Sequence, residues 1–371
     1  MYVKEGLAEI RVDEGVFFNP MMELCRDVSS LVVGTLKKKI SVLDGMCATG
    51  ARGIRYSMEN SCVKEVIFVD LSGKACKNTR HNARHNGFSG WSVRKGDVNA
   101  YLVDKAFDFI EIDPFGSPVP YLYSGVRSLS MNGGGTLSVT ATDVAVLCGA
   151  HYRACLKNYQ SKPLDNEYCH ENAIRILLGK IARCASEHNL GLVPLVGLSK
   201  HHYIKVVVEL RKGAERAVSS IKKLGFISHC PRCLWRGASG LVVKEKCKCG
   251  GILLHAGPLW IGELHEKAIL ENMRRENVKR GYGKTDEVDK IITKMICEVG
   301  MPATYYDLHK VSEVLGVSAE KVDSVMENLL QNGFKVCKTH FKENSIKTDA
   351  GIRDVKNALR KASGQRNRGN A

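Results

Sequence analysis

Short apolar runs recur along the first half of the chain, and most of them end at an aspartate. Runs of β-branched and aromatic residues that stop at such a charge are typical of buried strands. Between them lie helical segments such as 72–86, where Ser72 is the expected N-cap. This alternation predicts an α/β fold with a parallel sheet. The predicted strands cover residues 40–44, 66–70, 91–99, 107–112 and 136–143, followed by an antiparallel pair at 192–199 and 202–210.

Four of these strands lead into an acid: Asp44, Asp70, Asp97 and Asp113. The carboxyl ends of parallel strands meet at one edge of a sheet, where α/β proteins bind ligands. Each acid alone could be a helix cap or a strand-end charge. Independent caps would not need this regularity, so the series favours one ligand site.

The loop from Gly45 to about Gly50 consists mainly of small residues and leads from a strand into a helix. This is the layout of a nucleotide site, because small side chains let the backbone approach a ligand closely. The glycine spacing does not match G-x-G-x-x-G, and Asp44 would disfavour a pyrophosphate. An adenosyl cofactor with a cationic methionine end fits better, with Asp70 accepting from the ribose hydroxyls and Asp97 from the adenine amino group.

The segment from Phe107 to Pro118 reads as a buried strand that ends in a rigid turn at Asp113-Pro114-Phe115. Asp113 would project from the strand end, Pro114 leaves nearby carbonyls free to accept hydrogen bonds, and an aromatic ring follows. A carboxylate, free carbonyls and an aromatic face suit the exocyclic amine of a nucleobase. The alternative is an ordinary Asp-Pro turn.

The chain has 371 residues, enough for two domains, and a net charge of +16. This positive charge favours a polyanionic partner such as nucleic acid. No apolar run approaches the length of a membrane span, and the first residues lack the apolar segment of a signal peptide. We therefore expect a cytoplasmic protein without a membrane partner.

Fourteen cysteines are present, and ten are scattered singly through apolar surroundings, as expected of small buried hydrophobes in a reducing compartment. The other four form two close pairs, Cys230/Cys233 and Cys247/Cys249, which predict a four-thiolate structural zinc site in a zinc-ribbon-like element at about 228–262. Because the second pair is Cys-x-Cys, His229 or His255 could replace one thiolate. Spacing alone does not separate zinc from iron.

From residue 285 the pattern predicts helices at 286–299, 305–315 and 319–332, the last behind Ser318 as N-cap, followed by a basic strand at 333–342. This order is typical of a winged helix at about 285–350 that lies on nucleic acid. The alternative is a helical packing domain with a solvated basic surface. The tail 361–371 is cationic and expected to be disordered.

Together these motifs resemble the tRNA (guanine-26 N2)-dimethyltransferases of archaeal and eukaryotic type. The resemblance spans nearly the whole chain, and the ordered set is highly specific although each piece is weak. The matching pieces are Val16-Phe17-Phe18-Asn19-Pro20 with Arg26-Asp27, Asp44 to Arg55, Asp113 to Pro118, Thr140-Ala141-Thr142-Asp143, the cysteine pairs, and Gly257-Pro258-Leu259-Trp260-Ile261-Gly262.

The resemblance implies a Rossmann-like class I methyltransferase sheet at 1–211 and a smaller α+β domain for tRNA at 212–371. It implies that Asp113 acts on the guanine amino group and that Phe17 and Phe115 hold the base between their rings. The residues implied to contact S-adenosylmethionine are Arg26, Arg55, Asp70, Asp97 and Val98. An amine methyltransferase for another base and a catalytically silent RNA-binding protein are the alternatives. Whether one or two methyl groups are added, which tRNAs are accepted and the oligomeric state stay open.

Overall fold

The computed structural model describes residues 1–200, 202–240, 244–318 and 320–364. Its centre is a seven-stranded sheet in the order β5-β4-β3-β6-β7-β9-β8. The strands β3 to β7 of this sheet pair in parallel, and β9 runs antiparallel to both neighbours, as the sequence predicts. The strands are β3 (Ile40–Gly45), β4 (Val63–Asp70), β5 (Trp91–Lys95), β6 (Phe109–Ile112), β7 (Gly134–Ala141), β8 (Leu190–Lys200) and β9 (Tyr203–Lys212).

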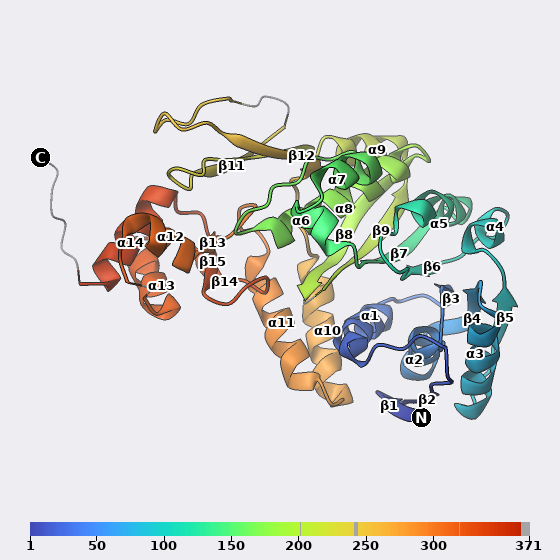
Figure 1. Ribbon diagram of the computed structural model, residues 1–371. Coiled ribbons are helices and arrows are strands. Elements are labelled where there is room, and N and C mark those ends of the chain that lie inside the picture. Colours follow the sequence, from blue (N-terminus) through green and yellow to red (C-terminus); the bar gives the residue numbers. More distant parts are fainter. Residues whose placement is uncertain (201, 241–243, 319, 365–371) are drawn as a thin grey trace, which may run out of the picture.

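Helices cover both faces of this sheet (Figure 1). The strand order reverses between β3 and β6, and the carboxyl ends at such a switch point open a crevice for a ligand. A hairpin of β1 (Tyr2–Glu5) and β2 (Ala8–Arg11), which the sequence pattern did not indicate, packs beside α2 and α3. The helices are α1 (Glu23–Gly34), α2 (Ala51–Glu59), α3 (Gly73–His85), α4 (Val98–Leu102), α5 (Val119–Met131), α6 (Val144–Cys148), α7 (Tyr152–Tyr159) and α8 (Cys169–Ser186), with a short 3-10 turn η1 (Pro20–Met22) before α1.

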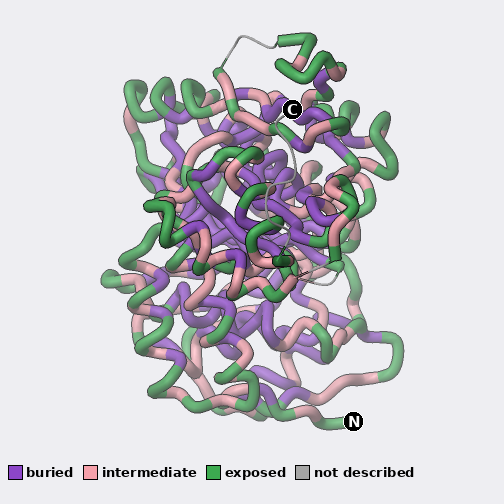
Figure 2. The backbone as a smooth tube through the Cα atoms, turned by 90° about the vertical axis from the view of Figure 1, so that its left-hand side faces the viewer, coloured by how far each residue is buried: buried purple, intermediate pink, exposed green. Residues whose placement is uncertain are grey.

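Buried residues concentrate along the sheet and the helices against it (Figure 2). One apolar cluster lies under α5 and α8, and another joins β3 and β4 to α2. A third includes Leu24 and Val28 of α1, Val196 of β8 and Leu270 of α10 (Lys267–Arg280). The segment after the predicted boundary at 211/212 therefore shares a core with the segment before it. The division into 1–211 and 212–371 stays a prediction.

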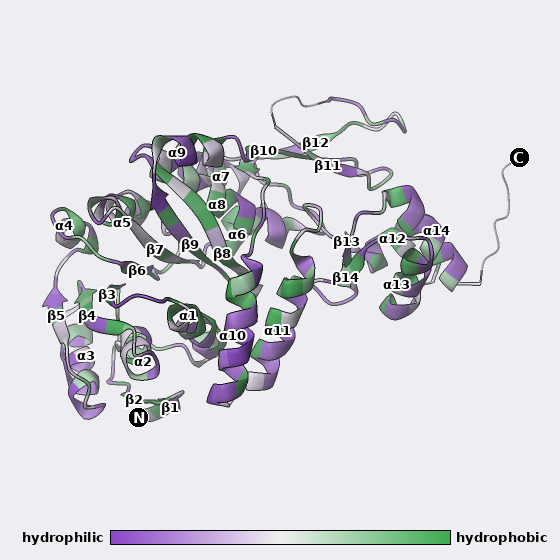
Figure 3. Cartoon of the chain, turned by 180° about the vertical axis from the view of Figure 1, so that it is seen from behind, coloured by the Kyte–Doolittle hydropathy of each residue, from purple (hydrophilic) through white to green (hydrophobic). Residues whose placement is uncertain are grey.

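The part of the chain after β9 begins with helix α9 (Ala214–Ile221). A small antiparallel sheet in the order β11-β10-β12 follows, and α11 (Thr285–Glu298) then packs against α10. Helix α10 was not predicted because its surface is mostly hydrophilic, as Figure 3 shows, and only a narrow face is buried. The strands are β10 (Leu224–His229), β11 (Arg236–Ser239) and β12 (Leu254–Trp260).

The carboxy-terminal part has the predicted order of three helices, α11, α12 and α13, followed by a basic strand, β14. Its strands form a small sheet in the order β13-β15-β14. The elements after α11 are β13 (Tyr306–Asp307), α12 (Leu308–Leu315), α13 (Val322–Gln331), β14 (Val336–Lys338), β15 (Ser345–Thr348) and α14 (Ile352–Ala362).

Three local predictions in this region were wrong. The helix predicted from residue 305 starts only at Leu308, because Tyr306 and Asp307 pair with β15 and Asp307 caps the helix. The helix predicted from residue 319 starts at Val322 with Lys321 as N-cap, so Ser318 does not cap it. Residues 361–362 of the predicted disordered tail belong to α14. The rest of that tail, from 365, lies outside the described residues, as does 319.

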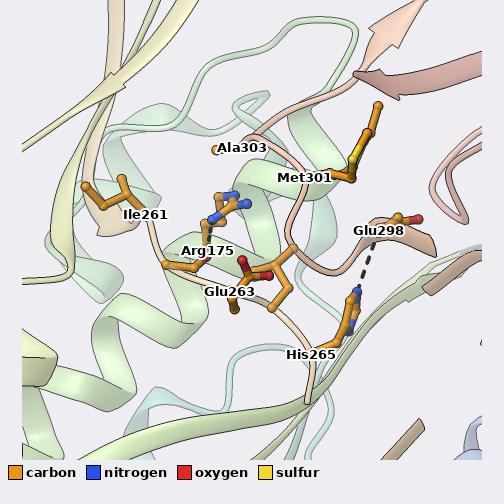
Figure 4. A pocket seen from close by; sticks show the side chains of 10 residues that line it. Arg175, Ile261, Glu263, His265, Glu298, Met301 and Ala303 are labelled. Carbon is orange, nitrogen blue, oxygen red and sulfur yellow. Dashed lines mark hydrogen bonds and ion pairs between the residues drawn. The ribbon is translucent and has the colours of Figure 1, made fainter. Parts of the chain in front are cut away.

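A buried ionic cluster joins the sheet domain to the carboxy-terminal elements. Glu171 of α8 accepts hydrogen bonds from Lys347 of β15 at 2.8 Å, from Arg175 and from the Thr304 backbone. Arg175 also donates to the Trp260 and Gly262 carbonyls, as it lies in the small polar cavity of Figure 4. Buried charges are tolerated where opposite charges and hydrogen bonds compensate them. This part of the Gly257–Gly262 motif therefore has a structural role.

Candidate active site

A cleft of about 500 Å³ opens at the carboxyl ends of β3, β4 and β6, where the strand order reverses. It is lined by the small-residue loop after β3, by the starts of α3 and α4, and by the turn after β6. Gly53, in the first turn of α2, has no room for a side chain, since an added Cβ would lie 2.5 Å from Phe68 Cε1 and 2.9 Å from Asp44 Oδ2, so α2 packs closely on β3 and β4. The predicted residues that line it are Phe17, Asp44, Asp70, Asp97, Val98, Asp113 and Phe115.

Asp70 and Asp97 both line the cleft. Asp70 is the last residue of β4, and Asp97 is the N-cap of α4. Asp70 accepts from the Ala48 amide at 2.9 Å and from the Ser72 amide at 2.8 Å. Asp97 caps α4 by accepting from the Asn99 amide. The helix-cap alternative therefore describes Asp97 correctly, yet both side chains also line the cleft. Each carboxylate oxygen has a second lone pair, so a cap can still accept from a ligand.

Asp113 follows β6 and is held by an arginine that the sequence analysis did not single out. Arg52 Nη2 lies 2.5 Å from Asp113 Oδ2, and 27% of the Asp113 side chain is exposed. Burial raises the pKa of Asp113, but the positive charges of Arg52 and Lys205 outweigh it and hold the pKa below its ordinary value. The carboxylate is thus in an internal ion pair and also borders a cavity large enough for a ligand.

A buried charge network lies beneath this ion pair. Arg52 Nε is 3.6 Å from Glu111 Oε1, and Glu111 also forms a fully buried ion pair with Lys205 of β9. Tyr56 donates to Glu111 at 2.8 Å, and Lys205 donates to Thr140. A signal for these residues was available, because Glu111 and Lys205 each interrupt an apolar strand, and charged side chains are rarely buried without a partner.

Asp44 differs from the other strand-end acids because it is almost fully buried. It accepts a hydrogen bond from the Gly53 amide at 2.9 Å, at the start of α2. Burial first, and then the charge of Glu111, raise its pKa to about 7. Asp44 thus ties the carboxyl end of β3 to the first turn of α2.

The two predicted base-binding aromatics, Phe17 and Phe115, meet at the mouth of the cleft. They are 51% and 75% exposed, and their ring centroids lie 4.4 Å apart with an interplanar angle of 76°. A base stacked between parallel rings would need centroids about 7 Å apart. In this arrangement the rings contact each other edge to face, so a base enters between them only if one ring moves. The Thr142 hydroxyl accepts from the Gly116 amide and holds the turn that carries Phe115.

Arg26 and Arg55, expected to contact the cofactor, do not line the cleft. Arg26 of α1 makes a bidentate pair with Glu5 and donates to the Asn19 carbonyl. Arg55 is fully buried and paired with Asp27 at 2.6 Å and with Glu59 at 2.7 Å. The positive charges of the two arginines are thus compensated by Glu5 of the β1–β2 hairpin, Asp27 of α1 and Glu59 of α2. Arg26 acts on the loop that carries Phe17, and a direct cofactor contact by either arginine stays a prediction.

The four predicted metal ligands come together after β10. Cys230 Sγ lies 3.5 Å from Cys249 Sγ, and Cys233 Sγ lies 3.6 Å from Cys247 Sγ. All four sulfur atoms lie within 4.8 Å of one another. His229 and His255, considered as replacements, are not part of this group, and His255 Nδ1 instead lies 2.9 Å from Ser228 Oγ.

The parallel sheet with one reversed strand, the small-residue loop and the acid-lined cleft define an S-adenosylmethionine-dependent methyltransferase. A family model described as "N2,N2-dimethylguanosine tRNA methyltransferase" matches residues 2–360. The chain belongs to this family, the tRNA (guanine(26)-N(2))-dimethyltransferases, which transfer methyl groups from S-adenosylmethionine to N2 of guanine 26 in tRNA.

Relatives match over nearly their full length. A tRNA (guanine(26)-N(2))-dimethyltransferase from Methanobrevibacter smithii is 35% identical over 379 residues, covering 97% of both chains. One from Methanothermobacter thermautotrophicus is 36% identical over 374 residues, covering 96% of this chain and 98% of the relative. The solved complex of Trm1 from Pyrococcus horikoshii with S-adenosyl-L-methionine has a TM-score of 0.89 at 31% identity, covering 97% of this chain and 99% of that one. No helix within the described residues is long and apolar enough to cross a membrane.

Proposed function

We propose that Asp113 is the group that accepts a hydrogen from the guanine N2 amine during methyl transfer. The observation that carries this assignment is the placement of its partly exposed, ionised carboxylate at the end of β6, against the cleft and next to Phe115. When bound, S-adenosylmethionine supplies an electrophilic methyl group. Asp70, Asp97 and Val98 line the part of the cleft that would hold its adenosine.

The residues of this chain make the amine a better nucleophile. The N2 lone pair of guanine is delocalised into the ring, so the amine reacts poorly until its hydrogens are drawn away. Asp113 accepts one N–H and the Pro114 carbonyl accepts the other, which localises the lone pair toward the methyl donor. Each transfer releases one N2 proton, which Asp113 accepts and passes to solvent. The carboxylate, ionised again, then accepts the remaining N–H in the second transfer. Arg52 keeps Asp113 ionised and in place.

Phe115 is proposed to stack on the guanine after the nucleotide leaves the tRNA core. Extruding a base costs a few kcal/mol, and stacking on an exposed ring offsets part of that cost. Replacing Phe115 with alanine is expected to raise KM for tRNA about tenfold or more, while KM for S-adenosylmethionine stays within twofold. Steady-state kinetics with an unmodified tRNA transcript measure both constants.

Tyr123→Ala is the matched control, because Tyr123 is a similarly exposed aromatic on α5 and does not line the cleft. An unchanged KM for tRNA in Phe115→Ala would refute the stacking role.

Mapping the modified nucleoside in the product separates one from two methyl groups and shows which guanine is modified.

The four-cysteine cluster is proposed to hold a structural zinc ion. The thiol separations of 3.5 and 3.6 Å approach the value of about 3.8 Å that tetrahedral zinc thiolates require. Four protein ligands leave no open position for water, so this ion would stabilise the β10–β12 sheet and take no part in methyl transfer.

Replacing Cys230 with alanine is expected to remove about one zinc per chain and to lower the melting temperature by several degrees, because a structural ion contributes directly to folding. The kcat of the folded fraction should change less than twofold. Elemental analysis and thermal melting measure these effects. Cys297→Ser, at an exposed cysteine outside the cluster, is the control. Wild-type protein that binds no metal at these thiols would contradict the proposal.

The division into a methyltransferase domain and a tRNA-binding domain is also proposed. In this proposal the strands β14 and β15, here called the wing strands, and the four-cysteine element face tRNA. Helix α13 occupies the position of the groove-binding helix in a winged helix, but its charged residues are acidic. The basic residues lie instead on and next to the wing strands, as with Lys335 and Lys338. Phosphate contacts through these strands fit the charge distribution better than insertion of α13.

A further inference from the structure

A second thiol cluster lies outside the predicted zinc element. Cys148 is the last residue of α6, and Cys169 and His170 are the first two residues of α8. The sequence analysis counted these cysteines among the scattered buried ones. The fold brings them together, with the two Sγ atoms and a ring nitrogen of His170 all within 4.8 Å of one another.

The sulfur-to-nitrogen separation in this cluster matches that of a tetrahedral metal site. Cys148 Sγ lies 3.7 Å from His170 Nδ1. Zinc bonds of about 2.3 Å to sulfur and about 2.1 Å to nitrogen at a tetrahedral angle require an S···N separation of about 3.6 Å. The four-cysteine cluster shows a comparable fit to its ideal spacing. Two thiols and an imidazole are also a ligand set that zinc prefers.

We propose that Cys148, Cys169 and His170 bind a second thiophilic divalent cation, zinc in the cell. Each thiol releases its proton to solvent when the cation binds, and His170 ligates through Nδ1, which lies 3.3 Å from Ser199 Oγ in this structure. The fourth position is left to water or to the carboxylate of Asp165, which packs against Gly149 beside Cys148.

This ion would support the wall of the substrate cleft. Helix α6 follows directly on Thr142, whose hydroxyl holds the Gly116 amide of the Asp113 turn. Tying the end of α6 to the start of α8 would fix this segment against the sheet. The ion lies behind the wall, because none of its three ligands lines the cleft.

A third group, His265, Glu298 and His340, has similar spacing but a different explanation. The Gly197 amide donates to His265 Nδ1 at 3.2 Å, so the ring proton is on Nε2 and faces Glu298 Oε2 at 3.7 Å (Figure 4). His340 and the Thr339 hydroxyl bond to the other Glu298 oxygen. A nitrogen that carries a proton cannot ligate a metal, so this group is a buried hydrogen-bonded carboxylate.

Metal stoichiometry tests the proposal on the full-length chain saturated with Zn²⁺ and freed of excess ion. We expect about two zinc ions per wild-type chain, and about one in both Cys148→Ser and His170→Gln. Cys230→Ala should also retain one, and Cys297→Ser should retain two as the control. Replacement by Co²⁺ gives a second measure, because thiolate-to-cobalt absorption scales with the number of thiolates. It should fall by about one third in the Cys148→Ser/Cys169→Ser double variant.

The outcomes separate this proposal from the one for the four-cysteine cluster. One ion per wild-type chain that is lost in Cys230→Ala and kept in Cys148→Ser overturns the second site, whether or not the variants are less stable. One ion that is lost in Cys148→Ser and kept in Cys230→Ala supports it and contradicts the first site. Wild-type chain without bound zinc overturns both.

Discussion

Replacing Asp113 with alanine is expected to lower kcat for methyl transfer by about 10²- to 10⁴-fold, the usual contribution of a positioned acid–base group. The affinity for tRNA should change less than about threefold, because binding rests on many phosphate contacts. Single-turnover methylation and a filter-binding assay separate the two effects. Near-wild-type turnover would refute the role assigned to Asp113.

Asp113→Asn is the matched variant, since it keeps the shape of the side chain but removes its charge. It should be nearly as inactive as Asp113→Ala. The pH dependence adds a further check. Because the pKa of Asp113 is below its ordinary 3.8, the carboxylate stays ionised above pH 5, and its protonation should not reduce the rate until the pH falls below about 4. A rate that falls with protonation near pH 6 would point to another base.

Replacing Arg52 with methionine is expected to produce the second large effect, on stability and activity together. The guanidinium is buried between Asp113 and Glu111, and removing one member of a buried ion network typically costs about 3–5 kcal/mol. Urea unfolding measures this loss. The rate should also fall about 10²-fold or more, because Asp113 loses the partner that orients it and holds its pKa down.

Arg52→Lys keeps the charge without the planar fork, so it should recover part of the stability but little of the rate. Arg153→Met, at an exposed position on α7, is the control and should change the unfolding free energy by less than about 0.5 kcal/mol. If Arg52→Met were as stable and as active as wild type, the ion pair would be dispensable and the assignment of Arg52 as a positioning residue would fail.

Local patterns predicted the elements that depend on neighbouring residues. The parallel strands, the Ser72 cap and the paired cysteines each leave a signal within a few positions, so the sequence predicts them and the structure contains them. Helix α10 and the β1–β2 hairpin were missed. Helix α10 has only a narrow apolar face, and the hairpin strands are too short to show a clear alternation of apolar and polar residues. Packing of α10 against α1 and of β2 against α3 stabilises them.

The amino-acid sequence alone determined the fold class, the edge of the sheet at which ligands bind and the family, because strand periodicity and strand-end acids are properties of the local order of residues. Tertiary structure decided which charges meet. Arg52 reaches Asp113 across 61 positions and Lys205 reaches Glu111 across 94, while Arg26 and Arg55 are directed to acids away from the cleft. Such pairings depend on how strands are ordered and helices packed, and burial then makes each unpaired charge too costly to leave alone.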